Sequence, residues 1–216
     1  MTNSKNLKLQ ALYKDYQNKI DEHFQDTLPH QFVWGFGSPD SKVILIGEAP
    51  GKDEVIQGRP FVGKAGQMLT DFLNGAGLNR DDLFITNTMK YRLAREGKRP
   101  GTLANRPAKR EEILFSCEYL KKEIEIIKPK AVVTLGNVPL KAMMLALDKS
   151  VKFSSLPEVG KVHGIPFKES FNDVNFILFP MYHPASVIYN KSLDSEYKND
   201  LKKFFSEISI FFEKKC

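Results

Sequence analysis

The sequence is poor in the residues that build disulfide frameworks and metal centres. Its 216 residues contain only two cysteines and four histidines. Cys117 and Cys216 lie far apart in the chain, so they form no disulfide framework, and by themselves they are too few for a zinc or iron–sulfur site. His23, His30 and His163 have no spacing that suits a metal ion. The sequence therefore predicts no metal site.

Long apolar runs are also absent. No stretch of about 18 apolar residues occurs, so we expect no membrane-spanning helix and no membrane partner. The N-terminus (MTNSKNLKLQ) lacks the basic-then-apolar layout of a signal peptide, which predicts a cytoplasmic protein. With 42% hydrophobic and 27% charged residues, the composition is that of a globular protein, and the length predicts one domain over residues 1–216.

Charge is unevenly distributed along the chain. Its 32 lysines and arginines exceed its 26 aspartates and glutamates, which gives a formal net charge of +6. Residues 90–110 hold eight basic residues against one acid, so this predicted loop carries +7 and the other 195 residues sum to −1. Such a patch is typical of a polyanion contact, with a solvated loop as the alternative. The basic residues are Lys90, Arg92, Arg95, Lys98, Arg99, Arg106, Lys109 and Arg110.

Four short apolar runs predict the strands of a parallel sheet. They are continuous rather than alternating, which indicates strands that are buried on both faces. Helical patterns separate them, so we expect a three-layer α/β/α sandwich with a central four-stranded parallel sheet. The predicted strands are Val43–Ile46, Leu83–Thr86, Ala131–Leu135 and Phe176–Phe179.

Apolar residues that recur every three or four positions predict the helices. An N-terminal helical segment lies within residues 1–30, and its apolar residues run from Leu9 to Phe24. The clearest stripe contains Ile113, Cys117 and Leu120 and ends before Pro129. The other predicted helices cover residues 68–73, 138–147 and 197–211, the last of which ends at Phe211.

Polar residues follow the predicted strands at their carboxyl ends, the edge at which open parallel sheets bind ligands. Glu48 comes shortly after the first strand, Asn87 ends the second, and His183 lies beyond the fourth. We therefore expect a carboxylate, an amide and an imidazole to converge on one site.

The glycine-rich loop after the first strand contains a near-match to a phosphate-binding motif. Residues 58–65 (GRPFVGKA) fit GxxxxGK[ST] except at Ala65, which lacks the hydroxyl that would hold magnesium. Pro60 also removes an amide donor, so a nucleotide hydrolase is disfavoured. Phe61 in this loop is either a plug for the core or a flat surface on which a base stacks.

Taken together, these motifs resemble those of the uracil-DNA glycosylase superfamily, and specifically its family 4 type. The resemblance covers roughly residues 33–201. It implies an enzyme that hydrolyses the N-glycosidic bond of deoxyuridine in DNA and leaves an abasic site. The motifs are GEAPG (Gly47–Gly51), GRPFVGKAGQ (Gly58–Gln67), ITN (Ile85–Asn87), NRPAKREE (Asn105–Glu112), PKAVVTLG (Pro129–Gly136) and YHPAS (Tyr182–Ser186).

The resemblance implies roles for the residues at the predicted site. Glu48 would position or polarise the attacking water and stabilise the cationic sugar. His183, helped by backbone amides near Ala49, would donate a hydrogen bond toward uracil O2. Asn87 would pair with uracil O4 and N3–H and reject cytosine.

The resemblance also implies how the base and the DNA are held. Phe61 would stack on the flipped base, and Glu54 would crowd the C5 side, where thymine carries a methyl group. A base leaves the helix stack only if something takes its place, so a wedge is needed. For this insertion we expect Val187 and Ile188. The residues expected to contact DNA are Lys90, Arg92, Lys98, Arg99, Ser186, Val187 and Ile188.

The sequence departs from family 4 where an iron–sulfur cluster would be bound. These enzymes typically use four cysteines: two near the N-terminus, one after the Asn strand and one in the following helix. Here Tyr91 stands at the third position and only Cys117 remains. One thiolate cannot hold a cluster, so we expect no cofactor, with local packing in its place and Cys117 as a small buried hydrophobe.

Alternative functions stay open at this point. One is removal of another base, such as hypoxanthine or xanthine, although the Gly47-Glu48 pair favours uracil. Another is a non-catalytic protein that binds uracil or DNA, which would have no need of the Glu48 carboxylate. Chemistry through a covalent histidine adduct is disfavoured because residues 90–110 contain no histidine. We expect a monomer that acts on uracil-containing DNA, single- or double-stranded.

Overall fold

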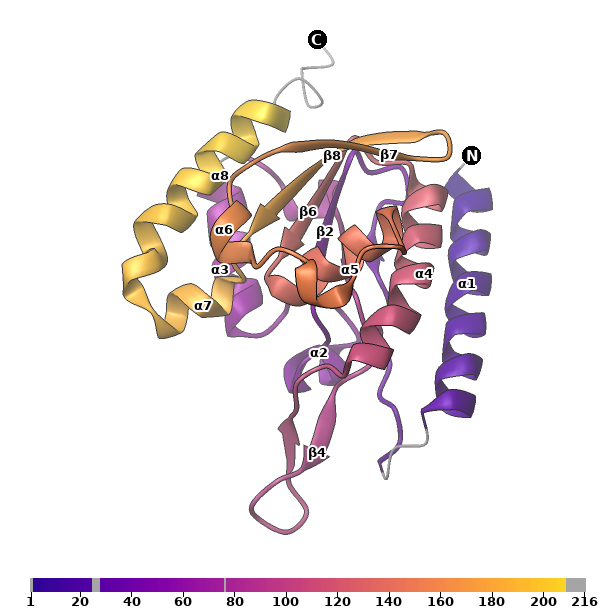
Figure 1. The fold of residues 1–216 in the computed structure, drawn as a ribbon. Helices are drawn as coiled ribbons and strands as arrows, with labels where there is room; N and C mark the ends of the chain where they lie inside the picture. The colour runs from indigo at the N-terminus through magenta and orange to yellow at the C-terminus, as the bar shows by residue number, and fades with distance from the viewer. Residues whose placement is uncertain (1, 25–27, 76, 209–216) are drawn as a thin grey trace.

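A six-stranded sheet forms the centre of the computed structural model, which describes residues 2–24, 28–75 and 77–208 (Figure 1). The four inner strands run parallel and each edge strand pairs antiparallel with its neighbour. In spatial order the strands are β1 (Phe36–Gly37), β3 (Phe84–Asn87), β2 (Val43–Gly47), β6 (Ala131–Leu135), β8 (Val174–Met181) and β7 (Phe167–Phe171).

The four inner strands are those that the apolar runs predict, and they are parallel as expected. The sheet nevertheless has six strands rather than four. β1 is only two residues long, and in β7 the exposed Lys168 and Ser170 alternate with partly buried or buried neighbours. Edge strands are half-covered, so neither carries the continuous apolar run from which the others were predicted.

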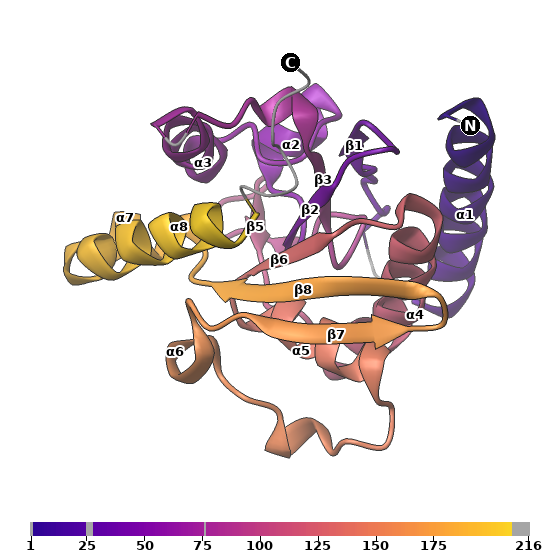
Figure 2. The same cartoon turned by 90° about the horizontal axis from the view of Figure 1, so that it is seen from above.

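Helices cover both faces of the sheet, which confirms the three-layer architecture (Figure 2). On one face lie α4 (Arg110–Ile127) and α5 (Asn137–Leu147), and α1 (Thr2–His23) packs against the outer side of α4. Ile44 and Ile46 of β2 point into the core on this face. No helix in the described part of the chain is long and apolar enough to cross a membrane.

The opposite face of the sheet is covered by α3 (Lys64–Gly75), α7 (Pro184–Tyr189) and α8 (Asp194–Ile208). Val43 and Leu45 of β2 point into this second core. Phe211, which the pattern places in the last helix, lies outside the described residues. The remaining helical elements are short: α2 (Lys52–Gln57), α6 (Val159–Val162), η1 (Arg80–Asp82), η2 (Phe153–Ser155) and η3 (Lys191–Leu193).

The basic segment 90–110 contains an antiparallel hairpin rather than only a loop. Its strands are β4 (Ala94–Glu96) and β5 (Leu103–Asn105), and in Figure 1 it projects from the lower edge of the molecule. At the tip, Thr102 Oγ1 donates a hydrogen bond to the Arg99 carbonyl at 2.7 Å. The tip of the basic segment therefore has a defined turn.

Candidate active site

The ends of β2 and β3 bring the predicted amide and carboxylate to one edge of the sheet. Gly47 and Asn87 are partners in the parallel register, and Glu48 is the next residue along. A Cβ atom at Gly47 would lie 2.4 Å from Asn87 Oδ1 and 2.5 Å from Phe61 Cζ. Only glycine permits this close approach.

Two adjoining hollows form the candidate site at this edge. The first, of about 220 Å³, has Asn87 and Phe61 in its wall. The second, of about 200 Å³, has Glu48 in its wall. Ala49, Asn105 and His183 line both, so the imidazole lies where the two hollows meet.

The His183 ring is a neutral hydrogen-bond donor. Its Nδ1 accepts a hydrogen bond from the backbone N–H of Ala185 at 3.1 Å, which leaves the proton of the neutral ring on Nε2. Burial lowers the pKa of His183 to about 4, although the negative charge of Glu54 acts in the opposite direction. The imidazole is therefore uncharged at neutral pH.

The Glu48 carboxyl group is partly buried beside this donor. Burial raises its pKa above the usual value, and a hydrogen bond from the backbone of Ala108 partly offsets the effect. A carboxylate with a raised pKa is a stronger proton acceptor than a fully solvated one. The site thus pairs a base with a neutral donor.

The Phe61 side chain packs in the core and also lines the first hollow. Its ring is only 6% exposed and lies 5.7 Å from the His183 ring at an angle of 29°. Its backbone has φ of 54°, in the left-handed region that non-glycine residues rarely adopt. Such a conformation persists only where the surroundings enforce it. The core role considered for Phe61 is therefore observed, and the role of its ring as a stacking surface for a base stays a prediction.

Glu54 holds the loop that carries Phe61. Its Oε1 accepts hydrogen bonds from the backbone N–H groups of Val62 and Gly63, both at 2.9 Å, and its Oε2 accepts one from Gly51 at 3.1 Å. Glu54 also lines the first hollow. The sequence reasoning missed this bracing role, because it depends on where the chain returns eight and nine residues later.

Asn105 is a site residue that the sequence reasoning did not assign. It lines both hollows from the end of β5, and its Oδ1 accepts a hydrogen bond from Arg92 Nε at 3.1 Å. This contact fixes the orientation of the carboxamide. The available signal was its place at the head of the NRPAKREE motif.

Comparison with known proteins identifies the family. Residues 34–208 match the family model of the Uracil DNA glycosylase superfamily. This chain belongs to that superfamily. The family resemblance stated from the motifs is therefore confirmed.

Similarity to type-4 uracil-DNA glycosylases extends over most of the chain. The chain is 38% identical to the enzyme of that name from Sulfurisphaera tokodaii over 172 residues, which are 79% of this chain and 72% of the relative. It is 35% identical to the Archaeoglobus fulgidus protein over 86% of this chain and 84% of the relative. A Thermotoga maritima relative is 30% identical, over 81% and 78% respectively.

In this superfamily member, two of the expected DNA contacts are buried. Lys90 is 1% exposed, and its Nζ lies 2.7 Å from Glu123 Oε2 in the core. Arg92 is 9% exposed, and it donates to Asn105 Oδ1 and the Leu103 carbonyl. Both predictions were wrong, because the first residues of the basic segment fold inward. Lys98 and Arg99 at the hairpin tip are exposed, as the prediction requires.

The fold also decides which of the residues predicted to insert into DNA are exposed. Val187, on the inner side of α7, is 1% exposed and packs into the core, so it was wrongly predicted to insert into DNA. The helical turn places the next two residues outward, with Ile188 37% and Tyr189 90% exposed. Ser186 is partly exposed beside them.

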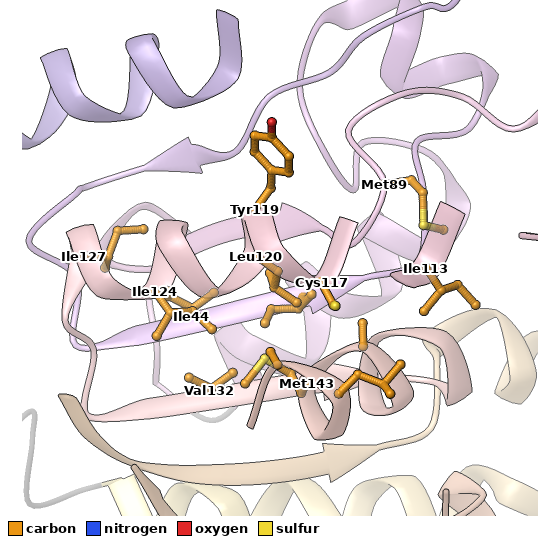
Figure 3. Packing of buried hydrophobic residues seen from close by; sticks show 14 of the residues in the cluster. Ile44, Met89, Ile113, Cys117, Tyr119, Leu120, Ile124, Ile127, Val132 and Met143 are labelled. Atoms are coloured by element: carbon orange, nitrogen blue, oxygen red, sulfur yellow. The ribbon is translucent and has the colours of Figure 1, made fainter. Parts of the chain in front are cut away.

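The described residues do not fit the iron–sulfur cluster of family 4. Cys117 is the only cysteine among them, and residues 2–24, 28–75 and 77–208 contain no group of three or more metal-binding side chains. Figure 3 shows Cys117 among the apolar residues beneath α4, where burial raises the pKa of its thiol to about 11. A thiol of this kind is a poor ligand because metals bind the thiolate. Cys216 lies outside the described residues.

Proposed function

We propose that this protein hydrolyses the N-glycosidic bond between uracil and deoxyribose in DNA, releasing uracil and leaving an abasic site. The type-4 relatives bear the name of this activity. The observation that carries the proposal is the meeting of Glu48, Asn87 and His183 around two adjoining hollows. A protein that only bound uracil would not need a carboxylate of raised pKa beside a neutral donor.

In the proposed reaction, His183 stabilises the leaving group. As the bond between C1′ and N1 breaks, its electron pair stays on the base, and negative charge develops on uracil O2. The Nε2–H group donates a hydrogen bond to this oxygen, helped by backbone amides near Ala49. The imidazole remains neutral throughout, in agreement with its low pKa.

Glu48 acts on the other partner of the cleavage. The sugar passes through an oxocarbenium-like state, which the nearby carboxylate stabilises electrostatically. The attacking water forms the new bond to C1′ and gives up a proton, which the carboxylate accepts. The raised pKa of Glu48 suits this transfer.

Recognition of uracil is assigned to the first hollow. Asn87 accepts from N3–H and donates to O4, and cytosine presents the reverse pattern. The Phe61 ring offers a face for stacking, and the hollow of about 220 Å³ is of a size for one flipped base. Glu54 remains the candidate for excluding the thymine methyl group, since it lines the same wall.

Two exposed features are assigned to the DNA strand. Lys98 and Arg99 at the hairpin tip would contact phosphates, and Ile188, with Tyr189 and Ser186 beside it, would fill the space of the flipped base. We propose that the protein is a cytoplasmic monomer that acts on uracil-containing DNA, single- or double-stranded. Sedimentation of the protein with and without each DNA form tests this assignment.

We further propose that the protein works without an iron–sulfur cluster. Tyr91 fills the position of one expected cysteine: it is fully buried, and its hydroxyl donates to Glu112 Oε1 at 2.7 Å. Glu112 also pairs with Arg106 at 2.7 Å. An iron assay and a visible spectrum of the purified protein test this point, and a brown protein would refute it.

The activity is tested by incubating the protein with an oligonucleotide that contains one uracil and then treating it with hot alkali. Cleavage at the uracil position is expected with the wild type and not with Glu48→Gln, which keeps the size of the side chain and removes its charge. Matched oligonucleotides with thymine or cytosine should stay intact. An intact uracil strand after wild-type treatment would refute the proposed function.

A further inference from the structure

The Lys90 ammonium group makes three hydrogen bonds inside the core, and one of them reaches the residue proposed to read the base. Nζ donates to the backbone carbonyl of Asn87 at 2.6 Å, to Thr86 Oγ1 at 2.6 Å and to Glu123 Oε2 at 2.7 Å. These bonds use all three of its protons. The charge is therefore held against the end of β3, and Lys90 is not among the residues that line the two hollows.

Two helices hold Lys90 in this position. From α4, Glu123 supplies the opposite charge, and its Oε1 also accepts hydrogen bonds from Tyr13 of α1 and from Thr86. Burial raises the pKa of Tyr13, which keeps its hydroxyl as the donor. Tyr16, one turn further along α1, accepts a hydrogen bond from the backbone N–H of Lys90 at 3.3 Å.

A buried ammonium is costly to desolvate, and an apolar side chain fills a core at lower cost. Lys90 differs from an apolar residue that would merely fill the core in its hydrogen bond to the Asn87 carbonyl. The carboxamide of Asn87 must meet two edges of the base at once, and recognition of this kind requires placement to within about 0.5 Å. A hydrogen bond that holds the Asn87 carbonyl restricts the end of β3, so the Asn87 carboxamide is placed more precisely than at an unrestrained strand end.

We propose that Lys90 is a positioning residue that fixes Asn87 for uracil recognition, with Glu123 and Tyr13 holding Lys90 in turn. The inference rests on the proposed function. It assigns the first basic residue of the 90–110 segment to base selection rather than to phosphate binding. It also links α1, which packs against the outer side of α4, to Asn87 through the hydrogen bonds of Tyr13, Glu123 and Lys90.

The test compares Lys90→Met with a variant that removes the network without leaving a buried charge, Tyr13→Phe/Lys90→Met/Glu123→Leu. Single-turnover excision and inhibition by free uracil are measured well below each melting temperature. Both variants should excise uracil about 10- to 100-fold more slowly and need a correspondingly higher concentration of free uracil for inhibition. Met143→Ala, a cavity in the same core away from Asn87, should change stability and leave both quantities within about twofold of the wild type.

A double-mutant cycle separates positioning from general destabilisation. If Lys90 acts through Asn87, Lys90→Met should change neither excision nor uracil inhibition by more than about twofold in an Asn87→Ala background. Equal losses in both backgrounds, or unchanged uracil inhibition in Lys90→Met, would overturn the inference while leaving the enzyme assignment intact. A wild type without activity on uracil would instead refute the proposed function, and the inference would fall with it.

Discussion

The two ends of the basic hairpin differ in what their charges can do. At its root, Lys90 and Arg92 are buried and bonded to groups of the core or the site. At its tip, Lys98 and Arg99 are exposed on a short antiparallel ribbon. All four belong to one basic run in the sequence. The difference teaches that a cluster of charge along the chain need not act as one surface: here the root bonds to Glu123 in the core and to Asn105 in the wall of the hollows, and the tip is exposed.

The largest expected effect lies at the cavity beside the root. Glu48→Gln should lower kcat about 10²- to 10⁴-fold, the range for loss of a general base, because no carboxylate then accepts the proton of water. The salt dependence of DNA binding should not change. Quenched-flow excision and a binding titration measure the two quantities. A large change in DNA binding with an unchanged kcat would show that Glu48 acts in DNA binding, like the tip, rather than in catalysis.

The next effect is on stability and distinguishes the two ends directly. Lys90→Met should lower the free energy of unfolding by about 3–5 kcal/mol, since it leaves the Glu123 carboxylate buried without its partner. Lys98→Ala, at the exposed tip, should change it by less than about 0.5 kcal/mol. Urea unfolding of both variants checks this. Similar losses in the two would contradict the division between root and tip.

The pH profile tests the chemistry of the cavity without a substitution. Protonation of Glu48 should lower kcat/KM about tenfold for each pH unit below its pKa, which lies above 4.5. His183, with a pKa of about 4, is neutral at pH 6.5 and adds no loss as the pH rises through that value. Activity should therefore have an acid limb that Glu48→Gln removes. A decline above pH 6.5 that depends on His183 would instead identify a protonated imidazole as the donor.

The smallest effect is expected at the tip. Lys98→Ala/Arg99→Ala should weaken DNA binding several-fold and reduce the slope of log affinity against log salt by about 1 for each residue. The kcat at saturating DNA should stay unchanged. Titrations at several salt concentrations measure the slope, and Lys168→Ala on the edge strand β7 provides an exposed control away from the site. An unchanged slope would show that the tip does not contact phosphate.

The parts of the fold that were predictable are those with a local signature. Val43–Ile46 and its three counterparts are recognisable because a strand that is covered on both faces must be apolar throughout. The convergence of Glu48, Asn87 and His183 follows from the parallel order, since the strands of such a sheet end at a common edge. The edge strand β7 was missed because a half-covered strand lacks that signature.

The side-chain partners were not predictable in the same way. In the sequence, Lys90 is one of the basic residues of segment 90–110, and no neighbouring residue indicates that it pairs with a buried carboxylate. Its partner, Glu123, is 33 residues away, on a helix whose polar residues would ordinarily face solvent. Val187 likewise reads as a suitable wedge, and only the direction of a single helical turn makes it part of the core.

The sequence by itself determined the layers of this protein, its family and the polar residues at the strand ends, because periodicity and motif order are properties of neighbouring residues. Only the tertiary structure decided which charges are buried, how Glu54 braces the loop of Phe61, and that Lys90 lies beneath Asn87 rather than on the surface. Those outcomes depend on where the chain returns in space: eight and nine residues after Glu54 for Val62 and Gly63, and 33 residues after Lys90 for Glu123. Their free energies are set by burial and hydrogen-bond geometry, which no local pattern specifies.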